Sequence, residues 1–463
     1  LLAFERLLAT ERDGGLGAAV MAGLALAAAS LTRSTGLALL AVSVVWIFWR
    51  RRGRGGWQLA GTALLAAACA IVPWSLYASA RAGCLVVVDL NGPFNLWSGN
   101  SAYAPADLQG VWGVGLPVQN GVDLRLAEFL PDEAWRREVP WRMAQDGIPD
   151  RFGCAGARWY RDEALSEIRR QPGQLLRRIP LRIAGLWSPD FFLPRHLLRD
   201  WYGALPPGLV AFLVMVAFAA AAIPLIGGPA SLATLPPSRF RSLSLAWIAV
   251  YLPAHALTFG LSRMHFPLVP LLLLGVAAFL FAAGLRQPAP DWRRLVRRGG
   301  PWALLVCLAW LWMAPTWAGL YLAPGPGHPQ VARVLGAARA LPVPGTRYAA
   351  WMLATVEASR GDSLQADRIL REPAHADHPW SLYLRGRIAA DGPDSVRLLE
   401  QALKRDPRLY PARLALGMQA VDRGALDEGI AQLEMARDLR PWDPEVRSAI
   451  ERARELQRRE SSP

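Results

Sequence analysis

The stretch FGLSRMHFPLVPLLLLGVAAFLF, residues Phe259–Phe281, decides the fold class of this chain. It places Arg263 and His265 in a narrow polar gap. Long apolar runs precede the gap (Leu243–Gly260) and follow it (Phe266–Gly284). Such runs predict membrane-spanning helices, so the gap is expected where a helical hairpin meets the membrane surface. Basic side chains at such a point either anchor the helix ends among lipid head groups or bind an anionic ligand.

The composition of the whole chain supports a membrane protein. Of its 463 residues, 53% are hydrophobic, and the mean hydropathy is +0.19, which is too apolar for an ordinary soluble domain. Acidic residues are absent from Gly14–Val88, Trp201–Pro290 and Trp292–Val356. The predicted membrane segments are Leu16–Leu31, Thr35–Trp49, Trp57–Tyr77, Leu209–Ile226, Leu243–Gly260, Phe266–Gly284 and Pro301–Leu322. The first two are shorter than the roughly 20 residues of a full span and are expected to form a hairpin that enters only part of the membrane.

Arginine clusters in short loops predict the orientation. They occupy Trp49–Gly56, Pro237–Ser242 and Leu285–Gly300, which are therefore expected on the cytoplasmic side. The stretch Ala78–Pro207 and the tail after Leu322 then lie outside the cytoplasm. A single lysine among many Ala, Gly and Arg residues is typical of a GC-rich bacterial gene, so we expect the bacterial cytoplasmic (inner) membrane.

This topology gathers Arg33, Arg263 and His265 on the outer side, from two separate hairpins. Basic groups that converge from several helices at one membrane face are suited to holding a phosphate beside lipid tails. We therefore predict a carrier-phosphate site formed by Arg263, His265 and Arg33.

The external stretch mixes polar and aromatic residues. Leu85–Leu90 has the β-branched composition of a strand, and the Asn-Gly-Pro after it indicates a turn. The polar residues Asp89, Asn91, Asn95 and Asn100 alternate with the aromatic residues Phe94, Trp97 and Tyr103. This pattern is typical either of a surface that contacts sugar or acceptor, mainly through Asn91, Asn95, Trp97 and Asn100, or of ordinary aromatic packing under a loop.

Two further features are expected in this external stretch. Cys84 and Cys154 can form a disulfide there, although no spacing rule requires it. Residues Glu163–Trp187 have apolar side chains at helical spacing, with Arg178 and Arg182 on another face. They predict an amphipathic helix that lies on the membrane and is interrupted near Pro180.

The tail repeats itself. Glycine recurs at Gly361, Gly392 and Gly424, and the pairs Ala402/Ala436 and Pro407/Pro441 are spaced by the period of paired-helix repeats. The stretches Tyr383–Pro407 and Leu414–Pro441, with a weaker one at Tyr348–Leu370, look like tetratricopeptide repeats, which bind protein partners on a concave face. The overall expectation is a predominantly all-α chain with membrane helices in 1–77, a mixed extracytoplasmic region in 78–207, membrane helices in 208–323 and a tetratricopeptide solenoid in 324–463.

Other chemistries lack sequence support. The formal charge of +14 would suit nucleic acid, but the chain has no zinc finger, no RNP-like pattern and no basic helix free of apolar neighbours. It contains no HExxH, CxxC, P-loop or strand-linked GxGxxG motif. No nucleic-acid partner, metal, nucleotide or redox cofactor is therefore expected.

Three patterns carry a resemblance to a known family. They are GLALAAASLTRSTGLAL (Gly23–Leu39), VPWSLYASARAGCLVVVDLNGPFNLWSGN (Val72–Asn100) and SRMHFPLVPLLLL (Ser262–Leu274). In this order they resemble the GT-C class of polyprenyl-phosphate-sugar-dependent membrane glycosyltransferases, including aminoarabinose transferases and protein O-mannosyltransferases. The resemblance covers roughly residues 10–285.

The resemblance implies transfer of a sugar from a polyprenyl phosphate to an envelope lipid, glycan or protein at the outer membrane face, with inversion at the anomeric carbon. An acidic residue would activate the acceptor hydroxyl, and basic residues would stabilise the departing phosphate. In the family this acid lies in a first external loop, which does not precede Leu16 here. Asp89 is the nearest acid that remains, so the catalytic residue is left unassigned and the chain is expected to be either a fragment or a non-catalytic relative.

Two alternatives of other classes stay open. One is a non-catalytic scaffold for envelope assembly that binds partners through the repeats of its tail. The other is an O-antigen ligase or polymerase, which can share the plan of many spans and a repeat tail. That class carries a large external loop with arginine and histidine, whereas Ala78–Pro207 has many arginines and no histidine before His196.

Overall fold

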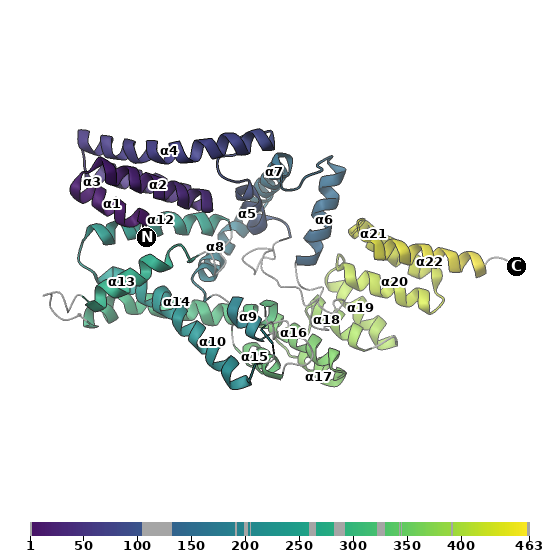
Figure 1. Cartoon of the computed structure of the whole chain (residues 1–463). Coiled ribbons are helices and arrows are strands. Elements are labelled where there is room, and N and C mark those ends of the chain that lie inside the picture. Colours follow the sequence, from purple (N-terminus) through teal and green to yellow (C-terminus); the bar gives the residue numbers. More distant parts are fainter. Residues whose placement is uncertain are drawn as a thin grey trace. The chain divides into compact units, whose positions relative to one another are not determined.

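The protein is all-α, as predicted, in the residues that its computed structural model describes (Figure 1). The described residues are 2–103, 132–189, 192–198, 202–203, 205–258, 265–281, 292–321, 329–341, 343, 345–389 and 392–460, and none of them forms a strand. Two compact units share the chain. Unit 1 consists of Leu1–Trp112, Ile148–Asp190 and Met215–Trp310, and unit 2 consists of Gly113–Gly147, Phe191–Val214 and Leu311–Pro463.

Unit 1 holds the apolar helices. They are α1 (Leu2–Asp13), α2 (Leu16–Thr32), α3 (Thr35–Arg50), α4 (Arg54–Ala82), α5 (Asn91–Asn100), α7 (Cys154–Arg170), α8 (Pro172–Leu186), α11 (Gly228–Thr234), α12 (Arg239–Leu257) and α13 (Val269–Phe281). Two helices have residues in both units, α10 (Pro207–Ala222) and α14 (Trp292–Tyr321). Helix α10 continues through the π-helical turn η2 (Ile223–Gly227) into α11.

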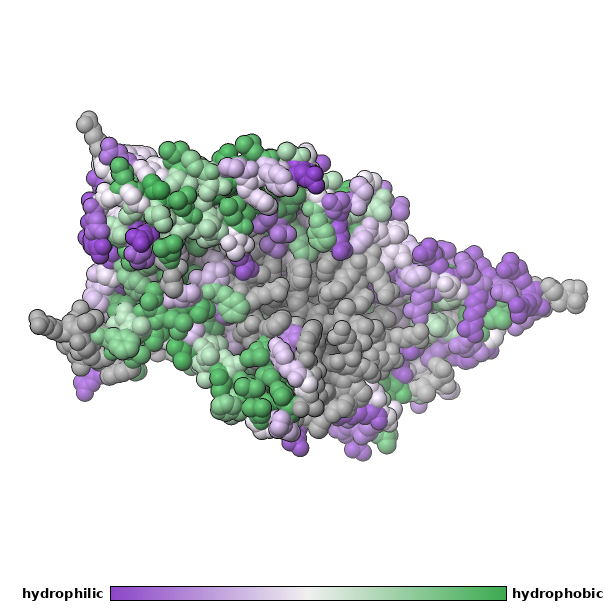
Figure 2. Space-filling model, in the orientation of Figure 1, coloured by the Kyte–Doolittle hydropathy of each residue, from purple (hydrophilic) through white to green (hydrophobic). Residues whose placement is uncertain are grey.

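Two of the described helical stretches, Gly55–Ala82 and Pro207–Thr234, are long and apolar enough to cross a membrane. Leu16–Thr32, Thr35–Arg50 and Val269–Phe281 are apolar but shorter. Figure 2 shows hydrophobic surface along α4 and hydrophilic surface over the C-terminal helices. Among the apolar side chains of α4, Leu64, Leu65 and Leu76 have exposed fractions of 49%, 66% and 67%.

Close helix contacts in unit 1 depend on small residues. A methyl group at Gly23 of α2 would overlap the carbonyl oxygen of Ala63 in α4, so only glycine permits this approach. Ala19 and Ala22 of α2 and Ala67 of α4 are fully buried in the same core. The alanine-rich composition of these segments therefore allows the backbones to approach closely.

Tryptophan side chains fasten α12 to α3. The indole of Trp247 donates to the hydroxyl of Ser43 over 3.0 Å, and Trp46 donates to Ser242 over 3.2 Å. The ring of Phe4 in α1 packs edge-on against Trp247, with centroids 5.3 Å apart. Each indole thus satisfies its one donor inside an apolar interface.

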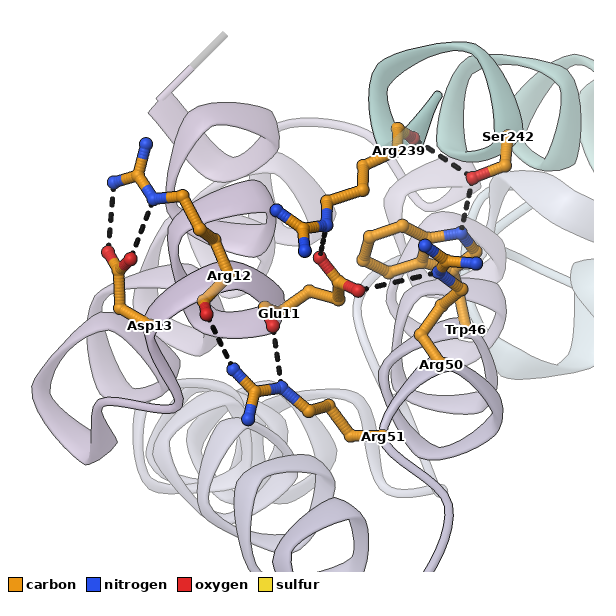
Figure 3. Close-up of polar contacts among 8 residues, drawn as sticks. All are labelled: Glu11, Arg12, Asp13, Trp46, Arg50, Arg51, Arg239 and Ser242. Carbon is orange, nitrogen blue, oxygen red and sulfur yellow. Dashed lines mark hydrogen bonds and ion pairs between the residues drawn. The ribbon is translucent and has the colours of Figure 1, made fainter. Parts of the chain in front are cut away.

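A buried glutamate joins the arginine clusters that the sequence assigned to two cytoplasmic loops (Figure 3). The Glu11 side chain is 6% exposed and forms ion pairs with Arg50 at 3.4 Å and with Arg239. Arg51 donates to the backbone carbonyl oxygens of Glu11 at 2.5 Å and Arg12 at 2.7 Å, which caps the end of α1. The clusters at the end of α3 and at the start of α12 therefore meet at one carboxylate.

The substitution Glu11→Ala tests this junction. It should lower the free energy of unfolding by about 2 kcal/mol, because Arg50 and Arg239 lose a buried partner although both are half exposed. Thermal unfolding in detergent measures the effect. Glu5→Ala is the matched control, since the Glu5–Arg6 pair is exposed at 61% and 41% and contributes little. Equal unfolding temperatures for the two variants would contradict the junction.

The expected strand at Leu85–Leu90 is wrong. This segment is irregular, and its backbone groups bond to side chains at the end of α4. The amide of Val86 donates to the Ser79 hydroxyl over 2.9 Å, and the carbonyl of Val88 accepts from the Trp74 indole over 2.9 Å. Side-chain partners replace the strand partner that the β-branched composition suggested.

The amphipathic helix expected in Glu163–Trp187 is broken at a different place. The chain leaves helical geometry at Gln171, between α7 and α8, and α8 passes through Pro180 without a break. Pro172 stands at the first position of α8, where a missing amide hydrogen is tolerated.

The Cys84–Cys154 disulfide is present, joining the end of α4 to the start of α7, with Cα atoms 6.2 Å apart. Thiol counting in denaturant tests it: protein purified without reductant should take up two maleimides, at Cys69 and Cys307, and four after reduction. Four labels before reduction would contradict the bond. The bond closes a loop of 70 residues. Reduction should therefore also destabilise the fold, by about 4 kcal/mol in the chain-entropy estimate.

Unit 2 contains the hydrophilic helices. They are α6 (Asp132–Gln145), α9 (Phe192–Leu198), α15 (Pro329–Arg339), α16 (Thr346–Ser359), α17 (Ser363–Leu370), α18 (Pro379–Ile388), α19 (Pro393–Arg405), α20 (Tyr410–Asp422), α21 (Leu426–Leu439) and α22 (Pro444–Glu460).

Helices α16 to α21 pack as three successive hairpins, α16 with α17, α18 with α19 and α20 with α21. Gly361 and Gly424 follow α16 and α20 with φ of +87° and +78°, the left-handed geometry that ends a helix. Gly392, the third periodic glycine, instead begins α19 in extended geometry. Inside the hairpins, Gly386 meets Leu399 and Gly417 meets Leu433, so equivalent glycines admit leucines from the second helix of each pair.

Candidate functional site

The C-terminal end of α12 is held by one arginine. A helix end leaves carbonyl oxygens without helical donors. Arg182 of α8 donates from Nη1 to the carbonyls of Ala256 at 2.9 Å and Leu257 at 3.1 Å. From Nη2 it donates to the Gly99 carbonyl and to the side-chain oxygen of Asn100 at 3.0 Å. One guanidinium therefore binds the ends of α5 and α12 together.

A second arginine reinforces this contact. Arg178, one turn earlier on α8, donates to the Gly99 carbonyl at 3.3 Å and to the Gln174 side chain at 2.9 Å. Asn100 donates to the Leu257 carbonyl over 2.9 Å. Arg178 and Arg182 are 2% and 0% exposed. Burial, and then the neighbouring charge of Arg178, lower the pKa of Arg182 to about 9, so this guanidinium remains charged at neutral pH.

The backbone at Gly99 leaves no space for a side chain. A methyl group there would overlap the carbonyl oxygen of Thr258, directly after α12, and would come within 3.1 Å of the Arg182 guanidinium. The glycine is required because α5 and α12 end against each other. We call Gly99, Asn100, Arg178, Arg182 and the end of α12 the α12 terminus.

Arg33, a predicted phosphate ligand, lies near α12. It follows α2, and its amide donates to the Ala29 carbonyl over 3.0 Å. Its charge acts on Tyr251 of α12, whose hydroxyl is also hydrogen-bonded to Thr35. Tyr251 packs on His255, with ring centroids 4.6 Å apart. The turn between α2 and α3 therefore borders α12 about 9 Å before its last residue.

His265, the second predicted ligand, is buried, with 3% of its surface exposed. Its Nδ1 lies 2.8 Å from the carbonyl oxygen of Leu186, the last residue of α8. This contact joins the segment after α12 to the helix that carries Arg182. Arg263, the third predicted ligand, lies outside the described residues.

The external residues that the sequence grouped together are separated. Asp89 accepts a hydrogen bond from the amide of Asn91 over 2.8 Å, which starts α5. Asn100 ends the same ten-residue helix, about 15 Å further along. Asp89 therefore has a helix-starting role, away from the arginines of the α12 terminus.

The aromatic residues of α5 form a small core. Trp97 is fully buried against Phe94 and Tyr160, at centroid distances of 5.8 and 5.1 Å. Burial raises the pKa of Tyr160 to about 12. Trp97 therefore has a packing role and does not present a face to a sugar, since other rings cover it. Asn91 is exposed and Asn95 is partly exposed, and both remain candidates for sugar or acceptor contact.

Arg178 and Arg182 were missed as site residues because they were assigned to the polar face of a membrane-lying helix. The spacing of the two arginines was the available signal. Like charges four residues apart lie on one helix face and repel each other, so such a pair can be stabilised by shared acceptors. In the part of the chain that the structure describes, no group of three His, Cys, Asp or Glu side chains could hold a metal ion.

Comparisons of this chain with protein-family models, with curated proteins and with solved structures found no match.

The substitution Arg182→Gln tests the α12 terminus. It should lower the free energy of unfolding by about 3 kcal/mol, because several buried carbonyls lose their donor. Arg177→Gln is the control, since Arg177 is exposed on the same helix. Thermal unfolding of the two variants in detergent measures the difference, and a stable Arg182→Gln variant would show that these bonds do not hold the helix ends.

Proposed function

We propose that this protein is a multi-spanning membrane glycosyltransferase that moves a sugar from a polyprenyl phosphate to an envelope acceptor at the outer face of the bacterial cytoplasmic membrane. The observation that carries the proposal is the gathering of basic groups at one end of α12. Arg182 holds its last carbonyls, and Arg178 holds the neighbouring Gly99 carbonyl at the end of α5. Arg33 borders the helix one to two turns earlier.

The membrane location is supported by apolar helices with exposed apolar surface. Gly55–Ala82 and Pro207–Thr234 have the length and composition of spans. Phe212 and Met215 of α10 are 55% and 64% exposed, and side chains of this kind on a long helix are suited to lipid contact. The disulfide suits an oxidising compartment, in keeping with an external position for the end of α4 and the start of α7.

In this proposal the α12 terminus stabilises the phosphate that leaves the sugar. A sugar that leaves a polyprenyl phosphate leaves negative charge on the phosphate oxygens, and fixed cations nearby lower the energy of that step. Two buried guanidiniums supply a positive potential where water is excluded, so the potential is weakly screened. In this proposal Arg178 and Arg182 are positioning residues, and Arg33, Arg263 and His265 approach the phosphate.

The base that activates the acceptor hydroxyl is not assigned. The sequence suggested Asp89, but this side chain accepts from the Asn91 amide and lies about 15 Å from Asn100, so it fixes the turn that precedes α5.

The C-terminal hairpins are proposed to be tetratricopeptide repeats that recruit a protein partner. A groove of about 610 Å³, lined by Val396, Arg397, Gln419 and Asp422 among others, gives such a partner a place to bind.

Sugar transfer in membranes tests the proposed function. With a panel of undecaprenyl-phosphate hexoses and pentoses as donors, Arg263→Ala and Arg33→Gln should each lower transfer to envelope acceptors at least a hundredfold, because each removes a cation that stabilises the leaving phosphate. Arg158→Gln, an exposed arginine on α7, should leave transfer unchanged. Wild-type protein that transfers none of these sugars, or variants that transfer normally, would contradict the enzyme assignment.

The groove of the C-terminal hairpins favours one second candidate, a non-catalytic scaffold. The same variants separate the two functions. A scaffold would give no transfer with any donor, yet wild type and Arg263→Ala would capture the same partner. Substituting Arg397→Glu in the groove would abolish that capture.

A further inference from the structure

A second basic site lies at the other end of α12. A groove of about 990 Å³ opens between the end of α3, the turn into α4 and the start of α12. Arg50, Arg51 and Arg52 line it together with Trp46 and Trp49, and no carboxylate is among the described residues of its lining. Nothing in the proposed sugar transfer uses this groove.

The charges of the groove are fixed in place. Arg50 is held by Glu11, and Arg51 is held by the carbonyls at the end of α1 (Figure 3). Glu11 is 6% exposed and is shared with Arg239, so one buried carboxylate faces two guanidiniums. Arg52 is exposed and lies over the Trp49 ring at 5.8 Å. The groove therefore keeps a net positive charge, with Arg50 and Arg51 held by fixed contacts.

The walls of the groove are apolar and open. Trp49 is 63% exposed and Val45 is 57% exposed, and both belong to the apolar helix α3. A free phosphate would use the guanidiniums but would leave this apolar surface in water. A phospholipid uses both, because its phosphate meets the arginines while its glycerol and first methylenes cover the tryptophan and valine. The aromatic ring beside the cations also suits a membrane interface.

We infer that this groove binds the head group of an anionic phospholipid, with Arg50 and Arg52 on the phosphate and with Trp49 and Val45 against the acyl chains. The inference rests on the membrane location proposed above but is independent of sugar transfer. Bound in this way, the lipid would link α3, the turn into α4 and the start of α12.

Lipid binding by the full chain tests the inference. Purified protein in detergent micelles is titrated with dioleoylphosphatidylglycerol or dioleoylphosphatidylcholine, and the bound lipid is counted by native mass spectrometry. The phosphatidylglycerol should bind saturably and more tightly than the phosphatidylcholine. Arg52→Gln should weaken its binding about fivefold. Trp49→Ala should also weaken it, and neither exposed substitution removes a buried contact.

The matched control is Arg81→Gln. Arg81 is an exposed arginine in the last turn of α4, about 40 Å from the groove end of that 29-residue helix. This variant should bind phosphatidylglycerol as wild type does. Equal affinity in wild type, Arg52→Gln and Trp49→Ala would overturn the inference, as would equal binding of the two lipids.

A competition experiment with glycerol 1-phosphate, which resembles the head group without acyl chains, completes the test. Full competition by this soluble phosphate would overturn the lipid assignment, because the apolar wall would then contribute nothing. Weak competition supports it. Binding is measured without any sugar donor, so loss of lipid binding and loss of sugar transfer are separate results.

Discussion

The hydrogen bonds from Arg182 to two helix ends are the interaction on which the packing of α5, α8 and α12 depends. Helices α5 and α12 both end where their last carbonyls are buried, and buried carbonyls require donors. A planar guanidinium spreads its N–H groups over three nitrogens and can serve both ends at once, whereas the three N–H groups of a lysine ammonium all sit on one nitrogen. Gly99 makes the arrangement possible because a side chain there would occupy the space of the Thr258 carbonyl.

Charge is confined to the two ends of α12, and the helix between them is largely apolar. At its start, Glu11 joins Arg239 to Arg50, and at its end Arg182 binds the last carbonyls. The helix has 19 residues and is therefore about 28 Å long, close to the hydrocarbon thickness of a bilayer. This spacing is consistent with the two anionic ligands that we propose, a carrier phosphate at one end and a phospholipid at the other.

Hydropathy and periodicity predicted the parts of this structure that depend on local sequence. The apolar helices, the all-α class and the paired helices of the tail follow from patterns that a single segment carries. The strand predicted at Leu85–Leu90 was wrong because Ser79 and Trp74, on another segment, supply its hydrogen bonds. The role of Arg178 and Arg182 was missed for the same reason, since amphipathicity shows which face is polar but not which carbonyls that face meets.

The predicted site residues also differ in how well the sequence placed them. Arg33 and His265 were chosen by topology, and both border elements that meet at the α12 terminus. Trp97 was chosen by composition, and it lies in a core of aromatic rings. The role of Arg33 and His265 as phosphate ligands stays a prediction. Composition misled for Trp97 because it does not distinguish an exposed ring from a packed one.

The central claim, a carrier-phosphate site beside the end of α12, is tested most directly by photocrosslinking. The full chain in membranes is irradiated with a benzophenone-bearing polyprenyl phosphate, and the labelled peptides are mapped by mass spectrometry. The label is expected on the turn between α2 and α3, around Arg33, and on the last turns of α12, and it should be lost when polyprenol without phosphate is used. Labelling elsewhere in the chain, or equal labelling by the phosphate-free polyprenol, would contradict the claim.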